Sequence, residues 1–257
     1  MSPRAKSARV GKDDDEPAAL LQCRGLEVGY HGMALLPPID VDIRAGQLWA
    51  VIGRNGSGKT TWLRTLLGLL PPVGGRIDGA RPDLRLSYLP QRKVIDELYP
   101  LLARDVVAMG LERGWSFLHP RFGKEPPEID EALKEMGVGS LGKVPYRQLS
   151  EGQKQRVLFA RLSVSRADVA VLDEPTSAMD QVAEGEAFQL LDGLRRRRGL
   201  AIIVVSHYLG MVERYADNAL LMDRDGQRIV AGPPDEVFRH DAFHARFSER
   251  PPPMEGL

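Results

Sequence analysis

The feature that most constrains this chain is Gly-Arg-Asn-Gly-Ser-Gly-Lys-Thr at residues 53–60, which matches the pattern G-x-x-x-x-G-K-[ST] at every fixed position. A continuous apolar run at residues 48–52 precedes it, as expected for a strand buried on both faces. Leucines at helical spacing follow over residues 60–70, and we expect the prolines at 71–72 to stop that helix. A glycine-rich turn between a buried strand and a helix N-terminus directs backbone N–H groups at an anion. The segment therefore predicts a phosphate-binding loop in an α/β fold.

Each residue type in this loop has a separate task. Lys59 supplies a point charge to the outer phosphates of a nucleotide, and the Thr60 hydroxyl is a ligand for Mg²⁺. The alternative is a glycine-rich turn without a ligand, but the strand before the loop and the helix after it favour phosphate binding. We expect the nucleotide to be bound by Gly53, Asn55, Gly56, Ser57, Gly58, Lys59, Thr60 and Thr61.

A second apolar run, at residues 169–172, leads into Asp173 and Glu174. A phosphate loop that binds magnesium needs a carboxylate at the end of a neighbouring strand, so we assign Asp173 to the metal. Glu174 is then placed to accept a proton from the attacking water. The alternative for this acidic pair is a helix cap, which Pro175 would suit. The complete phosphate loop favours the catalytic interpretation.

Apolar runs that alternate with helical stretches predict a mostly parallel sheet covered by helices on both faces. His207 follows the third run, at residues 201–205, and is expected where the strand ends converge and ligands bind. Residues 20–43 alternate apolar and polar side chains between turn signals, which predicts antiparallel strands. Residues 100–165 show a helical pattern without a strand run, interrupted by a proline- and glycine-rich loop at 114–127.

The charge balance and the cysteine count exclude several classes of protein. The chain of 257 residues has 35 Lys plus Arg and 35 Asp plus Glu, so a global electrostatic case for nucleic-acid binding fails. Cys23 is the only cysteine, which excludes an intrachain disulfide and a Cys-based zinc cluster. No apolar run reaches the roughly 18 residues of a membrane span, and acidic residues 13–16 stand where an export signal would be apolar. We expect a soluble, cytoplasmic protein.

Two smaller clusters have ordinary structural explanations. Four arginines at residues 195–198 are expected to form a solvated last helical turn that suits the helix dipole, rather than a binding patch. His240 and His244 have the spacing of one helix face and the chemistry to bind a divalent metal. No third ligand is near them in the sequence, so we expect a solvated pair.

Further motifs make the chain similar to the ATP-binding subunits of ABC transporters over about residues 20–247. Residues 149–153, Leu-Ser-Glu-Gly-Gln, resemble the signature Leu-Ser-Gly-Gly-Gln of that family, and Gln91 resembles the glutamine of its Q-loop. Residues 177–180, Ser-Ala-Met-Asp, resemble its D-loop. His207 matches the switch histidine, and Tyr30 matches the aromatic residue that stacks on adenine.

The resemblance implies a head-to-tail homodimer that binds two ATP molecules between its subunits. The phosphate loop of one copy would face Ser150, Gly152 and Gln153 of the other, and the helix expected at residues 152–165 would present its N-terminus to the γ-phosphate. Gln91 would ligate Mg²⁺ and sense the attacking water, His207 would contact the γ-phosphate, and Asp180 would link the two sites. Glu151 departs from the family glycine, which leaves the phosphate-facing geometry of the signature open.

The same resemblance supplies the expected domains and partners. We expect a disordered polar tail at residues 1–17 and one ATPase domain at 18–250, with a helical subdomain at about 95–165. The fold class is α/β, a P-loop NTPase core with an N-terminal antiparallel β-subdomain and this helical insertion. Expected partners are integral membrane permease subunits, a second ATPase subunit and a solute-binding protein, but no nucleic acid. ATP and Mg²⁺ are the expected ligands, and the location is peripheral, at the cytoplasmic face of the inner membrane.

The cargo is the least constrained prediction. Residues 99–110, after the Q-loop, resemble the ATPases of zinc, manganese and iron importers, which favours metal-ion import. The same segment also resembles ATPases for ferric siderophores and cobalamin, so these remain alternatives. A non-transport member of the superfamily is disfavoured because long coiled coils and a second cassette are missing. A small-molecule kinase would have no use for the signature.

Overall fold

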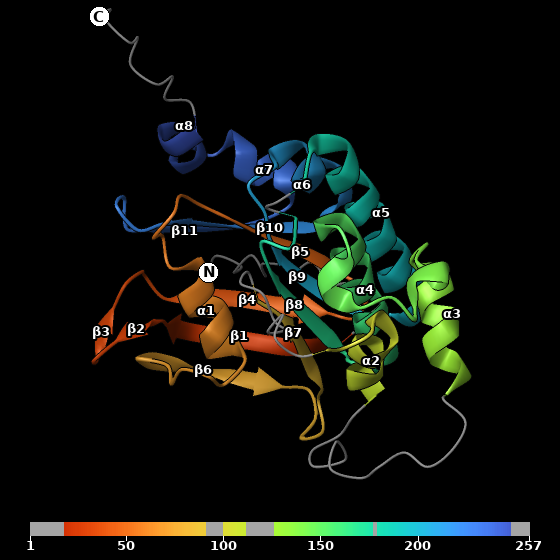
Figure 1. Ribbon diagram of the computed structural model, residues 1–257. Coiled ribbons are helices and arrows are strands. Elements are labelled where there is room, and N and C mark those ends of the chain that lie inside the picture. Colours follow the sequence, from red (N-terminus) through yellow and green to blue (C-terminus); the bar gives the residue numbers. More distant parts are fainter. Residues whose placement is uncertain (1–17, 91–99, 112–125, 177–178, 248–257) are drawn as a thin grey trace, which may run out of the picture.

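The computed structural model describes residues 18–90, 100–111, 126–176 and 179–247. A six-stranded sheet in the order β11-β10-β5-β9-β8-β7 forms its centre (Figure 1). The strands from β10 to β7 are parallel to their neighbours, and β11 is an antiparallel edge. This confirms the predicted mostly parallel sheet, whose members are β5 (Leu48–Ile52), β7 (Leu86–Leu89), β8 (Val169–Asp173), β9 (Ala201–Val205), β10 (Asn218–Asp223) and β11 (Arg228–Gly232).

Both faces of the central sheet are buried, and β5 shows how. Leu48, Ala50 and Ile52 belong to a core shared with the helices on one face, whereas Trp49 and Val51 belong to the core on the other. The alternation follows from the two-residue period of a strand. Because both faces of this strand pack against a hydrophobic core, a polar side chain on either face would be buried, which explains the continuous apolar run.

A smaller antiparallel sheet, in the order β4-β1-β6, packs with helix α1 (Lys59–Leu66) against one face of the central sheet. Its strands are β1 (Ala19–Glu27), β4 (Ile39–Arg44) and β6 (Gly74–Gly79), and β2 (Gly29–Tyr30) pairs with β3 (Met33–Ala34) beside it. The antiparallel strands were predicted correctly. Helix α1 is shorter than expected, because Gly68 has a φ of +69° and the chain leaves the helix before the prolines.

Between β7 and β8 the described residues form helices, with α2, α3 and α4 packed against one another. Figure 1 shows these helices and α5 on the face of the central sheet opposite α1. Most of the loop predicted at 114–127 lies outside the described residues, and Pro127 begins α3. The helices are α2 (Ala103–Ala108), α3 (Pro127–Glu135), α4 (Glu151–Val164), α5 (Gln181–Arg198), α6 (Leu209–Tyr215), α7 (Pro234–Arg239) and α8 (Asp241–Phe247).

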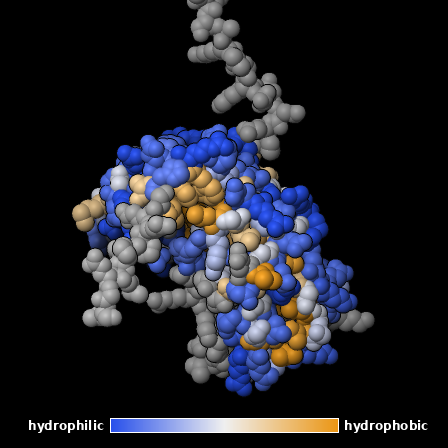
Figure 2. All heavy atoms as spheres, turned by 90° about the horizontal axis from the view of Figure 1, so that it is seen from above, coloured by the Kyte–Doolittle hydropathy of each residue, from blue (hydrophilic) through white to orange (hydrophobic). Residues whose placement is uncertain are grey.

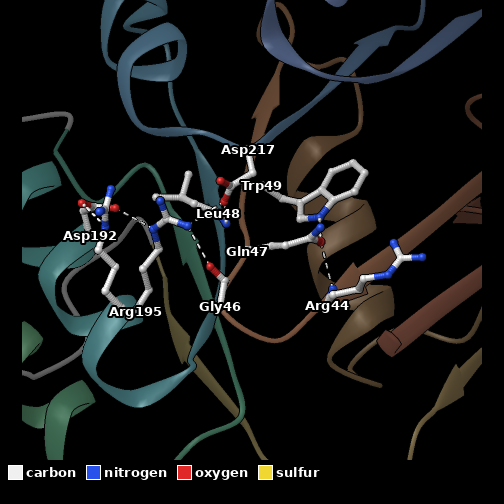
Figure 3. Close-up of polar contacts among 9 residues, drawn as sticks. Arg44, Gly46, Gln47, Leu48, Trp49, Asp192, Arg195 and Asp217 are labelled. Carbon is white, nitrogen blue, oxygen red and sulfur yellow. Dashed lines mark hydrogen bonds and ion pairs between the residues drawn. The ribbon is translucent and has the colours of Figure 1, made fainter. Parts of the chain in front are cut away.

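The arginine run at the end of α5 does more than end a helix, and the expectation of a wholly solvated turn was wrong for Arg195. This side chain is buried and donates to the Gly46 carbonyl at 2.7 Å, to Asp217 at 2.6 Å and to Asp192 at 2.6 Å (Figure 3). Asp217 in turn accepts the Leu48 N–H at 2.7 Å. The guanidinium therefore joins α5 to the amino-terminal ends of β5 and β10, at the edge of the sheet opposite the phosphate loop.

The surface seen from above is mostly hydrophilic, and hydrophobic side chains gather in separate patches (Figure 2). In the part of the chain that the structure describes, no helix has the length and apolar character needed to span a membrane.

Candidate functional site

The phosphate loop follows directly from the end of β5. Gly53 has a φ of +154°, and a Cβ at this position would lie 2.4 Å from the Met222 carbonyl oxygen of β10, so only glycine fits. Gly58 has a φ of +101° and is the N-cap of α1. These two glycines turn the chain from a buried strand into a helix whose first N–H groups lack partners within the helix. The loop therefore has the geometry expected of an anion-binding site.

Lys59 places a positive charge inside this loop. Its Nζ donates to the carbonyl oxygens of Gly53 at 2.8 Å and Arg54 at 3.1 Å, and the side chain is buried. Burial lowers the pKa of Lys59, while the charges of Glu174 and Asp173 act in the opposite direction. The two predicted carboxylates are therefore close enough to the ammonium group to act on it.

Asp173 meets the phosphate loop at the end of β8. The Thr60 hydroxyl donates to Asp173 Oδ2 at 3.0 Å, and the carboxylate is buried. Burial raises the pKa of Asp173, and the hydrogen bond from Thr60 opposes that shift. A hydroxyl and a carboxylate side by side are the hard oxygen donors that Mg²⁺ prefers, so this pair fits the ion.

Glu174 and His207 are in direct contact. Glu174 Oε1 lies 2.7 Å from His207 Nε2, which joins the residue after β8 to the segment after β9. Glu174 has a φ of +50°, a conformation that non-glycine residues rarely adopt and that clusters at functional sites. The acidic pair does not cap a helix, because α5 begins only at Gln181. The side chains of Glu174 and His207 therefore lie together at the carboxyl ends of β8 and β9.

Tyr30 lies beside the first turn of α1, where its hydroxyl is 3.2 Å from Thr61 Oγ1. Tyr30 remains exposed although it is aromatic. An exposed aromatic ring next to a phosphate loop is a suitable platform for a nucleotide base.

The signature segment forms the start of α4. Ser150 is the N-cap: its Oγ accepts the Gln153 N–H at 3.3 Å, and its own N–H donates to Gln153 Oε1 at 3.0 Å. Glu151, the departure from the family pattern, pairs with Lys154 at 2.9 Å. The glutamate therefore has a partner within its own helix, and the helix N-terminus forms normally around it.

The other predicted residues are placed as follows. Asp180 caps α5 by accepting the Ala183 N–H at 2.8 Å. Gln91, Ser177 and Ala178 lie outside the described residues. His240 is the C-cap of α7 and His244 belongs to α8. The expectation that the two histidines share one helix face was therefore wrong. Among the described residues no group of three or more His, Cys, Asp or Glu side chains is arranged to bind a metal.

Sequence reasoning missed a contact on the flank of the phosphate loop. A pocket of about 180 Å³ lies between the loop, the end of β10 and α8. Arg246 of α8 pairs with the buried carboxylate of Asp223 at 2.7 Å, and Asp223 also accepts the Gly226 N–H at 3.0 Å. Arg246 and Asp223 are 23 positions apart, and no local sequence pattern relates them, so this ion pair could be found only from the fold.

Comparisons with known proteins show similarity over most of the chain. Residues 36–177 match the profile of the family described as "ABC transporter". "Zinc import ATP-binding protein ZnuC" of Pseudomonas entomophila (strain L48) is 34% identical over 236 residues, which is 90% of this chain and 84% of that protein. The protein of the same name from Paramagnetospirillum magneticum is 33% identical over 235 residues, with the same coverage. The structure of cbiO1 from Clostridium perfringens, part of the ABC transporter complex cbiONQ, superposes with a TM-score of 0.72 at 26% identity, covering 90% of this chain and 96% of that one.

Proposed function

We propose, from the premise that this chain belongs to the ABC transporter family, that it is the ATPase subunit that powers import of zinc or a similar divalent metal ion through a separate membrane permease. Support for the cargo comes from the relatives named as zinc import ATP-binding proteins, which align with most of this chain. Their names favour metal import over the siderophore and cobalamin alternatives.

One geometric observation supports the ATPase role most strongly: the hydrogen bond between Thr60 and Asp173 brings the phosphate loop and the carboxylate of the next motif together at one sheet edge. In this proposal the loop N–H groups and Lys59 bind the β- and γ-phosphates. Lys59 would exchange its bonds to the loop carbonyls for bonds to phosphate. Tyr30 would stack on the adenine.

Thr60 and Asp173, with Gln91 from outside the described residues, would hold Mg²⁺. When bound there, the ion would neutralise charge on the β- and γ-phosphates. The oxygen donors that the structure shows are of the kind this ion prefers.

Glu174 would accept the proton of the attacking water as general base. A base must be held within hydrogen-bonding reach of that water, and the 2.7 Å contact with His207 would orient the Glu174 carboxylate before nucleotide binds. His207 remains partly exposed and would contact the γ-phosphate by exchanging its Nε2 contact with Glu174 for one to the phosphate. The two residues would thus share the task of orienting the reaction.

A second copy would complete each ATP site. Ser150, Gly152 and Gln153 lie at the N-terminus of α4, a helix of 14 residues, so its positive end would face the γ-phosphate bound by the partner. Asp180 would join the two sites from the start of α5. Because ATP supplies the charge that both copies bind, cleavage of the γ-phosphate would release the clamp.

The permease would dock where α4 approaches the edge strand β7. A cavity of about 900 Å³ lies there between β7, α4 and residues 109–111, and Tyr88, Arg161 and Arg166 are among its lining residues. Its mixture of apolar and basic groups suits an amphipathic helix of a membrane partner. Binding to the permease would place this subunit peripherally at the cytoplasmic face of the inner membrane, with a solute-binding protein on the other side.

Reconstitution of the complex tests the proposed function. We expect the chain, copurified with its membrane partner and placed in proteoliposomes with the solute-binding protein, to take up zinc only when ATP is supplied. Glu174→Gln provides the matched control and should abolish uptake while ATP still binds. Uptake of a ferric siderophore or cobalamin in place of free metal would contradict the cargo, and uptake that continues without ATP would contradict the ATPase role.

A further inference from the structure

Glu184 is a fully buried carboxyl group, 0% exposed, in the first turn of α5. Its Oε1 accepts a hydrogen bond of 2.8 Å from the Thr176 hydroxyl, and Thr176 is also buried. Within the described residues the other oxygen, Oε2, has no hydrogen-bond partner. Burial raises the pKa of Glu184. A buried carboxyl with one unpaired oxygen opposes folding, so its presence beside core residues of α5 such as Phe188 and Leu191 needs another explanation.

The explanation lies in what Thr176 supports. Thr176 is two residues after Glu174, and Pro175 between them has a restricted φ. The Thr176 carbonyl also accepts the Met179 N–H at 3.0 Å, so both its side chain and its backbone are held. Glu174 itself has a φ of +50°, a conformation that persists only where its surroundings enforce it.

The other end of the contact is equally well fixed. The Glu184 N–H donates to the Asp180 carbonyl at 2.9 Å, inside the helical turn that Asp180 caps. The bond between Thr176 and Glu184 therefore ties the strand-end segment that carries Glu174 to the helix start that carries Asp180.

We propose that Glu184 is a positioning residue of the hydrolytic site, which holds Thr176 and thereby the backbone that aims the Glu174 carboxylate. The inference rests on the proposed function, because it takes Glu174 as the general base. A buried hydrogen bond of this kind acts on catalysis through geometry, since a displacement of about 1 Å can cost roughly a hundred-fold in rate. The phosphate loop lies on a different element, so we expect its affinity for nucleotide to change little when this bond is lost.

Steady-state kinetics of the full chain with MgATP test the proposal. Glu184→Leu and Thr176→Val remove the hydrogen bond with little change in volume, and each should lower kcat by about ten- to a hundred-fold while KM for ATP stays within about two-fold. Glu184→Gln keeps a hydrogen-bond acceptor and Thr176→Ser keeps the hydroxyl, so each variant should have a kcat within about three-fold of the parent. The double variant Glu184→Leu with Thr176→Val should be no slower than the slower single variant, because one bond is lost in all three.

Glu186→Gln provides the matched control, since Glu186 is on the same helix but forms an exposed ion pair with Arg156. Its kcat should equal that of the parent. A parent-like kcat in Thr176→Val and Glu184→Leu would overturn the inference. An equally large loss of kcat in Glu184→Gln and Glu184→Leu would also overturn it. The proposed function is tested separately by Glu174→Gln: if this variant turns over ATP normally, Glu174 is not the base, whatever the Glu184 variants do.

Discussion

At the scale of the residue, the site holds charges that folding alone would not retain. Lys59 and Asp173 are both buried, and burial moves the pKa of each in the direction that disfavours its charged form. A folded protein that buries such groups without a ligand loses stability, which binding of an oppositely charged ligand restores. The two buried groups are therefore expected to cost stability until the proposed ligand binds.

The pH dependence of the stability of Asp173→Asn tests whether the buried carboxylate destabilises the nucleotide-free protein. Because the pKa of Asp173 is raised on folding, the native state binds the proton more tightly than the unfolded chain, so stability falls as the pH rises through that pKa. Asparagine keeps the hydrogen bond from Thr60 without the charge. We expect the Tm of the nucleotide-free variant to exceed that of the parent by about 1–3 °C at pH 7.5. The difference should shrink towards pH 4, where the parent carboxyl becomes protonated.

Differential scanning calorimetry across that pH range makes the measurement. Asp83→Asn provides the control, because Asp83 is exposed and its Tm difference should stay near zero at every pH. A lower Tm for Asp173→Asn at pH 7.5 would show that the carboxylate stabilises the empty site.

Most residues of the candidate site were predicted because their patterns are local. The phosphate loop, Asp173, Glu174 and His207 each follow directly from an apolar run, and parallel strands bring their carboxyl ends to one edge. The bond between Thr176 and Glu184 was not predicted, because a glutamate on a helix is usually exposed and no pattern marks a buried one. Long-range pairs of this kind depend on packing that periodicity does not encode.

At the scale of the element, α5 links the proposed nucleotide site to the opposite edge of the sheet. Its first turn contains the cap at Asp180, and its last turn contains the buried Arg195. The sequence predicted the helix but not this difference among four adjacent arginines, because only the side chain that faces Gly46 and Asp217 becomes buried. In the same way, the end of α1 at Gly68 was missed because the leucines beyond it keep a helical spacing.

Arg195→Leu should lower the free energy of unfolding by about 2–3 kcal/mol, because it removes a buried charge that three acceptors share. Arg196→Leu is the matched control: its side chain is 72% exposed and pairs with Asp192, so we expect a loss below about 0.5 kcal/mol. Urea denaturation measures both values. KM for ATP should be unchanged in both variants, since the network lies at the amino-terminal ends of the strands, and a raised KM in Arg195→Leu would contradict that separation.

At the scale of the whole molecule, the proposed function uses two different surfaces of one chain, one for its own nucleotide and one for the nucleotide bound by a second copy. The phosphate loop lies at the start of α1 and the signature lies at the start of α4, and each helix N-terminus offers its own site for negative charge. The fold class and the family were predictable, because the motifs occur in a fixed order along a regular α/β pattern. The pairing of two copies remains a prediction, because it involves contacts between two chains.

The mass of Glu174→Gln in solution with ATP and Mg²⁺ tests whether ATP joins two copies of the chain. Light scattering coupled to size-exclusion chromatography should give twice the monomer mass, because both copies bind a triphosphate that they cannot cleave. Adding Lys59→Ala should abolish nucleotide binding and pairing, whereas adding Ser150→Arg should abolish pairing while each monomer still binds ATP. A monomer mass for Glu174→Gln with ATP fully bound would contradict the account.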